Sequence, residues 1–483
     1  MMRMKKNALS GPEIPVLFLV LGLLFWGGCA SPRAAPPAHP NILTLNRVLR
    51  FEHRVVNTGD RPGRVEMFLA VPQDNERQSI RFFRPDPSFT EELIDEYGNR
   101  ILHYVDDHVA AGDVVAHGWI AEVEISSFVS RPVAVKPLST RQREIFLRNG
   151  ESYQIDSDIV SGLAGKLEAG STGEEETVQR IFDHIIRNLR YKRDDVWDPA
   201  PVVLERRSGS CSEYNYAFLA LCRAAGIPAR YTGGITLSTR GVTKYDPLVS
   251  EDAVFHRWSE VFLPGRGWFP VDCSRASGEV KRFGNPDNYY GRLPAGSLQC
   301  MRGDGLGKAP LGWDYISNQK LPHKEEKDWS GKVGFWIAGV EPGTLEACID
   351  AIENDIRKNR TRALFDSLLK TPLEREILFL YRNLLEKENV VDLIEALCAA
   401  RHPEVVYWSL LAEHRGIAVP EKLRYAALCG TFLRGRIEKF YLGKGGARDL
   451  FTFEYWWRKA RPATRWDAKT GRFILLNRKI NIY

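Results

Sequence analysis

The sequence RSGSCSEYNYA, residues 207–217, places Cys211 directly before a series of apolar residues spaced three and four apart. This spacing predicts a helix over 211–225 that ends at Gly226 and Pro228. Cys211 therefore lies in the first helical turn, where unpaired backbone N–H groups carry partial positive charge. These groups favour a thiolate and could stabilise an oxyanion, so Cys211 is a candidate nucleophile.

Two strand-like runs follow this helix, at residues 255–263 and 268–272, and a segment rich in Pro and Gly joins them. Adjacent antiparallel strands can bring His256 and Asp272 side by side. A plain four-residue loop would place Asp272 on the opposite face of the hairpin from His256. An odd-length loop or a bulge would place both on one face, and the glycines at 264–267 make a bulge easy. The pattern permits either register.

A cysteine, a histidine and an aspartate in this order fit thiol catalysis, with His256 as the base and Asp272 as the residue that orients it. The region also resembles the transglutaminase-like superfamily over about residues 174–300. The resemblance implies an α+β papain-like fold and a triad of Cys211, His256 and Asp272. Arg257 departs from the family pattern, because a small residue is common there. The motifs that carry the resemblance are GSCSEY at 209–214, CRAAGIPARY at 222–231, HRWSEVF at 256–262 and GWFPVD at 267–272.

Two aromatic residues near these motifs are further candidates for the site. Tyr191 follows a predicted helix at 174–189, and Trp258 lies two positions after His256. Either could contribute to an oxyanion hole or a cleft wall, with packing in the core as the alternative. None of the eight cysteines forms a CxxC pair or a Cys/His cluster with zinc-ligand spacing, so we expect no metal and no cofactor. We also expect no disulfide framework, because four cysteines lie among apolar residues in helical patterns, where a buried free thiol is usual: Cys222, Cys348, Cys398 and Cys429.

The first 28 residues have the pattern of an export signal. Basic residues precede an apolar run at 14–25, and small residues then precede Cys29. This pattern resembles a bacterial lipoprotein signal, which implies a lipid on Cys29 and a membrane-anchored protein of the cell envelope, facing the periplasm or the cell surface. Plain secretion and an uncleaved anchor are the alternatives. Residues 29–40 are rich in Pro and Ala and predict a linker.

The remaining sequence predicts a multidomain α+β protein. With 44% hydrophobic and 27% charged residues, the chain has the composition of a globular protein. β-rich runs separated by turns predict a β-sandwich at 41–150, followed by the core at 151–300. Gly, Lys, Pro and Asp dominate 301–334, which we interpret as a linker. Apolar stripes of helical period predict a helical domain at 335–435.

The C-terminal segment at 436–483 is basic and aromatic. From residue 431 onward the sequence has thirteen Lys/Arg against four Asp/Glu, with Trp and Phe interleaved. This composition suits an anionic surface such as lipid headgroups or acidic glycans. A folded helix and hairpin with a solvated basic face is the alternative. The net charge of the whole chain is only +6, and we expect no nucleic acid partner.

These features predict a thiol enzyme of the cell envelope that acts on an amide bond of a protein or peptide through a thioester on Cys211. Water as the acceptor would make it a peptidase or amidase, and an amine would make it a transglutaminase. Hydrolysis is favoured, since transfer requires a cleft that excludes water. The alternative is a catalytically silent module that binds a protein partner or the cell wall.

Overall fold

The structure is a computed structural model that describes residues 43–86, 89–193, 197–237, 248–250, 255–283, 286–305, 311, 317–321, 329–339, 342–357, 387–441, 453, 456–457 and 460–477. The predicted export signal, Cys29 and the linker at 29–40 lie outside these residues. Among the described segments, no helix has the length and apolar character needed to cross a membrane. Sheets and helices both contribute large parts of the structure, as expected for a multidomain α+β chain.

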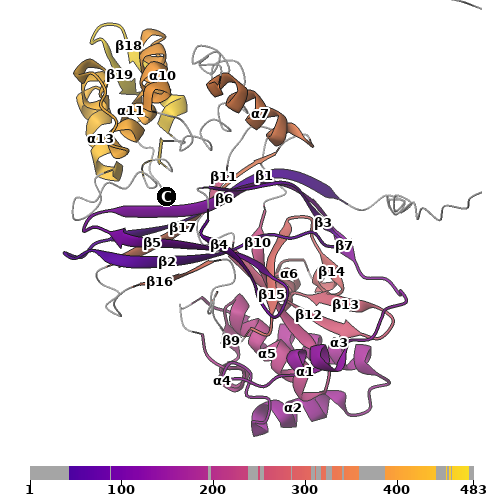
Figure 1. The fold of residues 1–483 in the computed structure, drawn as a ribbon. Helices are drawn as coiled ribbons and strands as arrows, with labels where there is room; N and C mark the ends of the chain where they lie inside the picture. Colours follow the sequence, from indigo (N-terminus) through magenta and orange to yellow (C-terminus); the bar gives the residue numbers. More distant parts are fainter. Residues whose placement is uncertain are drawn as a thin grey trace, which may run out of the picture. The chain divides into compact units, whose positions relative to one another are not determined.

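Two antiparallel sheets form the predicted N-terminal β-sandwich (Figure 1). The Trp119 indole donates to the Ala70 carbonyl of the opposite sheet at 3.2 Å, and the Tyr104 hydroxyl donates to the Gly118 carbonyl at 3.1 Å. These bonds satisfy polar groups within a core of buried apolar side chains from both sheets. The first sheet has the order β11 (Leu248–Ser250), β17 (Trp329–Gly339), β1 (Thr44–Asn57), β6 (Val114–Ser126), β3 (Gln78–Asp86); the second has the order β16 (Ser317–Lys320), β2 (Gly63–Ala70), β5 (Arg100–Val109), β4 (Glu91–Ile94).

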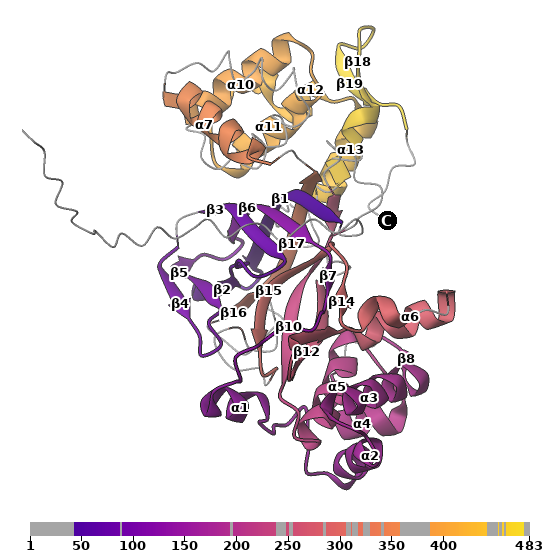
Figure 2. The same ribbon diagram turned by 90° about the vertical axis from the view of Figure 1, so that its right-hand side faces the viewer.

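Two strands of this sandwich come from the segment at 301–334 that the sequence predicts as a linker. β17 pairs with β1 over its whole length, with Phe335 opposite Phe51, and β16 pairs with β2 (Figure 2). The linker prediction is wrong for these strands, and β17 also occupies the start of the predicted helical domain at 335–435. The composition of this segment does not indicate strands. A strand depends strongly on the strands that it pairs with, and these partners lie near the other end of the chain.

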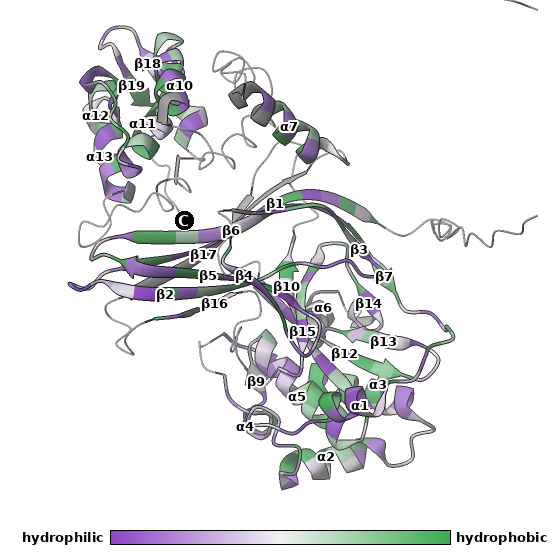
Figure 3. Ribbon diagram, in the orientation of Figure 1, coloured by the Kyte–Doolittle hydropathy of each residue, from purple (hydrophilic) through white to green (hydrophobic). Residues whose placement is uncertain are grey.

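The core that follows is built around α5 (Cys211–Ala224), whose side chains are buried over nearly its whole length. α5 contacts the surrounding helices and a sheet of order β13 (Gly267–Val271), β12 (Phe255–Leu263), β10 (Ala229–Thr236), β15 (Ser297–Gly303). Figure 3 shows the hydrophobic residues of these elements. The other helices are α1 (Thr140–Phe146), α2 (Asp158–Glu168), α3 (Glu174–Asn188), α4 (Ala200–Arg206), α6 (Cys273–Phe283) and the 3₁₀ helix η1 (Pro286–Tyr289). Short ladders join β8 (Arg190–Tyr191) to β9 (Ser208–Gly209) and β7 (Phe128–Val129) to β14 (Arg292–Leu293).

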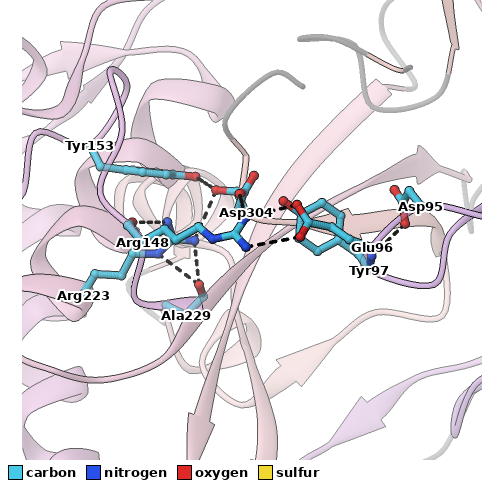
Figure 4. Close-up of polar contacts among 8 residues, drawn as sticks. All are labelled: Asp95, Glu96, Tyr97, Arg148, Tyr153, Arg223, Ala229 and Asp304. Atoms are coloured by element: carbon cyan, nitrogen blue, oxygen red, sulfur yellow. Dashed lines mark hydrogen bonds and ion pairs between the residues drawn. The ribbon is translucent and has the colours of Figure 1, made fainter. Parts of the chain in front are cut away.

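A polar cluster joins the turn between β4 and β5 to the core (Figure 4). The Arg148 guanidinium donates to the Glu96 carboxylate at 3.1 and 3.2 Å and to Asp304 at 3.4 Å. The Tyr153 hydroxyl and Arg223 both donate to the Asp304 carbonyl. Because Asp304 directly follows β15 and Arg223 lies at the end of α5, these bonds fix the β-sandwich turn against both elements.

The C-terminal region contributes most of a second apolar core, which also includes Val48 of β1 and Ile120 of β6. Trp456 and Trp457, which belong to the predicted basic aromatic segment at 436–483, are at most 1% exposed and pack in this core. These two side chains are therefore structural and do not form an anionic-surface contact. A helix and a hairpin are present, as in the alternative prediction. The elements are α7 (Thr344–Arg357), α10 (Lys387–Ala399), α11 (Glu404–His414), η4 (Glu421–Leu423), α12 (Tyr425–Leu428), α13 (Thr431–Tyr441), η5 (Arg461–Ala463), β18 (Thr464–Asp467) and β19 (Arg472–Leu475).

Candidate active site

Cys211 is the first residue of α5, as the sequence predicts. The carboxylate of Glu213, in the first turn, accepts the backbone N–H of Ser210 at 2.7 Å and pairs with Arg206. This contact satisfies one backbone donor and fixes the point at which the helix begins. Gly209 is required just before it, because a Cβ at that position would lie 2.6 Å from the Cβ of Glu213. The nucleophile candidate thus lies at a rigid helix start.

The hairpin of β12 and β13 settles the register that the sequence left open. Leu263 lies opposite Gly267 and Ser259 lies opposite Val271, so the loop has the odd length of three residues. Gly265 and Gly267 adopt φ values of +72° and +75°, a backbone region that favours glycine. Asp272 follows Val271 directly and therefore lies on the same face of the hairpin as His256, two positions along the neighbouring strand.

His256 and Asp272 are in direct contact. A hydrogen bond of 2.6 Å joins Nε2 of His256 to Oδ2 of Asp272. The other oxygen of Asp272 accepts the Ser274 hydroxyl at 3.0 Å and the Arg275 N–H at 3.1 Å. Burial raises the pKa of Asp272, but His256 and Arg275 lower it more, and the pKa lies below its usual range. Asp272 is therefore a carboxylate at neutral pH, although its side chain is only 2% exposed.

The thiol of Cys211 interacts with the same imidazole. Burial raises the pKa of the thiol, but the hydrogen bond and charge of His256, together with the charge of Arg257, bring it below its ordinary value. Burial lowers the pKa of His256, yet Asp272 and the bond to Cys211 leave it above its ordinary value. Since Nε2 is bonded to Asp272, Nδ1 is the nitrogen left for the thiol. These shifts favour a thiolate beside an imidazolium.

The lowered thiol pKa distinguishes Cys211 from five other cysteines of the described chain. Cys211 is partly accessible to solvent, and its pKa is lowered. Cys273 directly follows Asp272, yet it is buried, and burial together with the Asp272 charge raises its pKa. A thiol must ionise to act as a nucleophile, so Cys273 is not a competitor. Burial also raises the pKa of Cys222, Cys300, Cys398 and Cys429.

Tyr191 and Trp258, the two aromatic candidates for the site, differ in exposure to solvent. The β8–β9 ladder pairs Tyr191 with Gly209 and so places Tyr191 beside the start of α5, with 52% of the residue exposed. Tyr191 can therefore line the site. Trp258 is only 1% exposed and lies in the interior of the core sheet. It therefore packs in the core, which is the alternative that the sequence left open. It shares the face of β12 that carries His256, and the centres of the two rings lie 6.4 Å apart.

Sequence reasoning missed the residues that hold the site in place. Ser274 and Arg275 bond to Asp272, and Ser212 accepts a hydrogen bond from Arg257. One signal was available for the first pair, since an aspartate just before a helix commonly accepts the N–H three residues later. Within the described residues, no group of His, Cys, Asp and Glu is arranged to hold a metal ion.

Comparisons with known proteins find similarity in the same part of the chain. Residues 161–273 match the family model of the transglutaminase-like superfamily, and this segment contains all three triad candidates. A protein-glutamine gamma-glutamyltransferase from Pseudomonas aeruginosa is 26% identical over 161 residues, which are 31% of this chain and 24% of that protein. An uncharacterized protein from Haemophilus influenzae is 35% identical over 77 residues, which are 14% of this chain and 21% of that protein.

The chain thus spans about a quarter or less of the length of these relatives. Among solved structures, a candidate cysteine protease from Cytophaga hutchinsonii is 18% identical with a TM-score of 0.44, and the match covers 62% of this chain and 93% of that one. The periplasmic domain of TgpA from Pseudomonas aeruginosa is 16% identical with a TM-score of 0.26, covering 51% and 92%. The family match identifies residues 161–273 as a transglutaminase-like domain.

Proposed function

We propose that the core is a thiol enzyme that cleaves or transfers the acyl group of an amide through a thioester on Cys211, with hydrolysis as its main reaction. The observation that carries the proposal is the 2.6 Å bond between His256 and Asp272, next to a thiol whose pKa is lowered. A carboxylate that fixes a histidine, and a histidine that takes the proton of a cysteine, are what acyl transfer by a thiol needs.

In the first half of the reaction, His256 takes the thiol proton and the sulfur attacks the carbonyl carbon of the amide. The N–H groups at the start of α5 would donate to the oxyanion that forms. His256 then gives its proton to the leaving nitrogen as the C–N bond breaks, and a thioester on Cys211 remains. Asp272 keeps its charge throughout and stabilises the imidazolium.

In the second half, an acceptor attacks the thioester carbon. His256 takes the proton of the acceptor and returns it to the sulfur as the C–S bond breaks. The partly exposed Cys211 and the 52% exposed Tyr191 beside it support water as the acceptor. An amine acceptor is the second candidate, because the Pseudomonas aeruginosa relative is named as a gamma-glutamyltransferase.

The location and partners form part of the same proposal. The apolar run at 14–25 and the small residues before Cys29 support a lipid-anchored enzyme of the cell envelope that faces outside the cytoplasm. Proteins or peptides there would be its substrates. The basic residues of the C-terminal segment, rather than its buried tryptophans, would contact any anionic surface.

The test is to incubate the full chain with peptides from a cell-envelope extract, quench in acid and analyse Cys211 by mass spectrometry, with and without an added primary amine. An acyl adduct on Cys211 that turns over to free acid supports hydrolysis, and an amide of the added amine supports transfer. A chain that binds envelope peptides but never forms an adduct would instead be the catalytically silent module.

A further inference from the structure

A buried arginine lies next to the candidate nucleophile. Arg257 follows His256 on β12, and because successive side chains of a strand point to opposite faces, it points away from the face that carries His256. Its guanidinium donates to the hydroxyl of Ser212, the residue after Cys211 in the first turn of α5. Strand β12 therefore supplies two groups to this helix start, the imidazole and the guanidinium.

The guanidinium contacts two aromatic rings. Its central carbon lies 5.2 Å from the ring of Trp197 and 5.5 Å from the ring of Tyr231. Arg257 is only 2% exposed, so it is not available to contact a substrate. Ring contacts of this kind orient a guanidinium and stabilise its charge away from water. The residue is thus fixed in position at the positive end of α5.

We propose that Arg257 is a positioning residue that adds a permanent positive charge to the N-terminus of α5 and thereby stabilises the thiolate of Cys211. This inference rests on the proposed function, because it assigns Arg257 a part in activating the same sulfur. Arginine stays protonated at any pH at which an enzyme works, and a charge in a buried site acts across a weaker dielectric than water. The Arg257 charge also lowers the pKa of Cys211, in agreement with this role.

A role for the charge of Arg257 and a role for its packing alone predict different effects of substitution. If only the shape of Arg257 mattered, Arg257→Gln could loosen the core but would leave the ionisation of Cys211 unchanged. If the charge matters, the thiol pKa rises when the charge is removed and returns when a lysine restores it. Thiol ionisation is the readout that separates the two, and it requires no substrate.

The experiment measures the rate at which iodoacetamide alkylates Cys211 of the full chain between pH 4 and 10, with the site assigned by mass spectrometry. We expect Arg257→Gln to raise the apparent thiol pKa by about one unit, which slows alkylation below that pKa by up to about tenfold. Arg257→Lys should recover most of the shift. Arg424→Gln, the same change at a side chain that is 54% exposed in the C-terminal region, should have no effect.

Folding of each variant is checked by its melting temperature. A folded Arg257→Gln with the thiol pKa of the wild type overturns the inference, and so does an Arg257→Lys that shifts the pKa as much as Arg257→Gln. Should neither variant fold, Ser212→Ala provides the test: it removes the anchor of the guanidinium but no charge, and we expect a smaller rise in the thiol pKa. An unchanged pKa in folded Ser212→Ala contradicts the inference.

The wild-type profile separates this inference from the proposed function. A wild-type Cys211 with an ordinary thiol pKa that does not respond to His256→Gln overturns both. A low pKa that depends on His256 but not on Arg257 leaves the proposed function in place and overturns only the role of Arg257.

Discussion

Nε2 of His256 lies 2.6 Å from Oδ2 of Asp272, although the two residues come from different strands and are separated by a three-residue loop. The bond fixes which nitrogen of the imidazole is left for Cys211. It also places a buried negative charge behind the base, where it stabilises the imidazolium that thiol chemistry forms.

Removing the charge of Asp272 should disable the site without unfolding the core. In Asp272→Asn the amide can hold the wrong imidazole tautomer and no longer stabilises the imidazolium, so we expect kcat/KM to fall by up to about 10⁴-fold. Ser274→Ala removes one hydrogen bond to Asp272 but keeps its charge, and should cost less than about tenfold. If both variants lost activity equally, the charge would not be what matters.

The pH profile of kcat/KM should be a broad bell. The reactive form is the thiolate with an imidazolium, so activity rises as pH passes the lowered pKa of Cys211 and falls as pH passes the raised pKa of His256. Because Cys211 and His256 interact, the pKa values of the two limbs describe the pair and not either residue alone. Because Asp272 raises the pKa of His256, Asp272→Asn should move the alkaline limb to lower pH. An alkaline limb that stays in place would contradict this origin of the shift.

A methyl group at Gly209 should distort the helix start. In Gly209→Ala the new Cβ would meet Glu213 at 2.6 Å, and we expect a loss of about 1–3 kcal/mol in the free energy of unfolding together with slower alkylation of Cys211. Gly165→Ala is the matched control, because this glycine lies in α2 with open space around it and alanine favours helix. Urea unfolding should show the control to be as stable as the wild type or slightly more so.

Alkylation should be selective among the cysteines. One equivalent of iodoacetamide at pH 6.5 should label Cys211 well before Cys273, because burial and the neighbouring carboxylate raise the pKa of Cys273 while that of Cys211 is lowered. Peptide mapping gives the ratio. Labelling of Cys273 at a comparable rate would show that the two thiols do not differ in the way the structure requires.

The parts of the site that sequence predicted are those encoded by short segments. Helix spacing placed Cys211 at a helix start, and the order of motifs brought His256 and Asp272 together with it. The sequence could not predict on which face of the hairpin Asp272 lies, because a loop one residue longer or shorter would move it to the opposite face. The length of the loop is known only from the pairing of β12 with β13. Trp258 packs in the core, and the strand pattern could not decide between core and cleft wall, because Trp258 lies on the same face of β12 as His256.

Contacts between segments far apart in the chain could not be predicted from the sequence. β17 completes a sheet by pairing with β1, almost 300 positions earlier in the chain, and its glycines and lysine resemble those of a linker. The contact of Arg257 with Ser212 likewise depends on how β12 packs against α5, which no local pattern records. In both cases the contact depends on a segment far away in the sequence, so neither segment alone is enough to predict it.

The most direct test compares the apparent pKa of the Cys211 thiol in the wild type and in His256→Gln, measured from the pH dependence of alkylation. The wild-type value should lie below the ordinary thiol value of about 8.5 and should rise towards it when the imidazole is removed. A value near 8.5 in both proteins would show that the sulfur is not activated by His256, and the proposed mechanism would then be wrong.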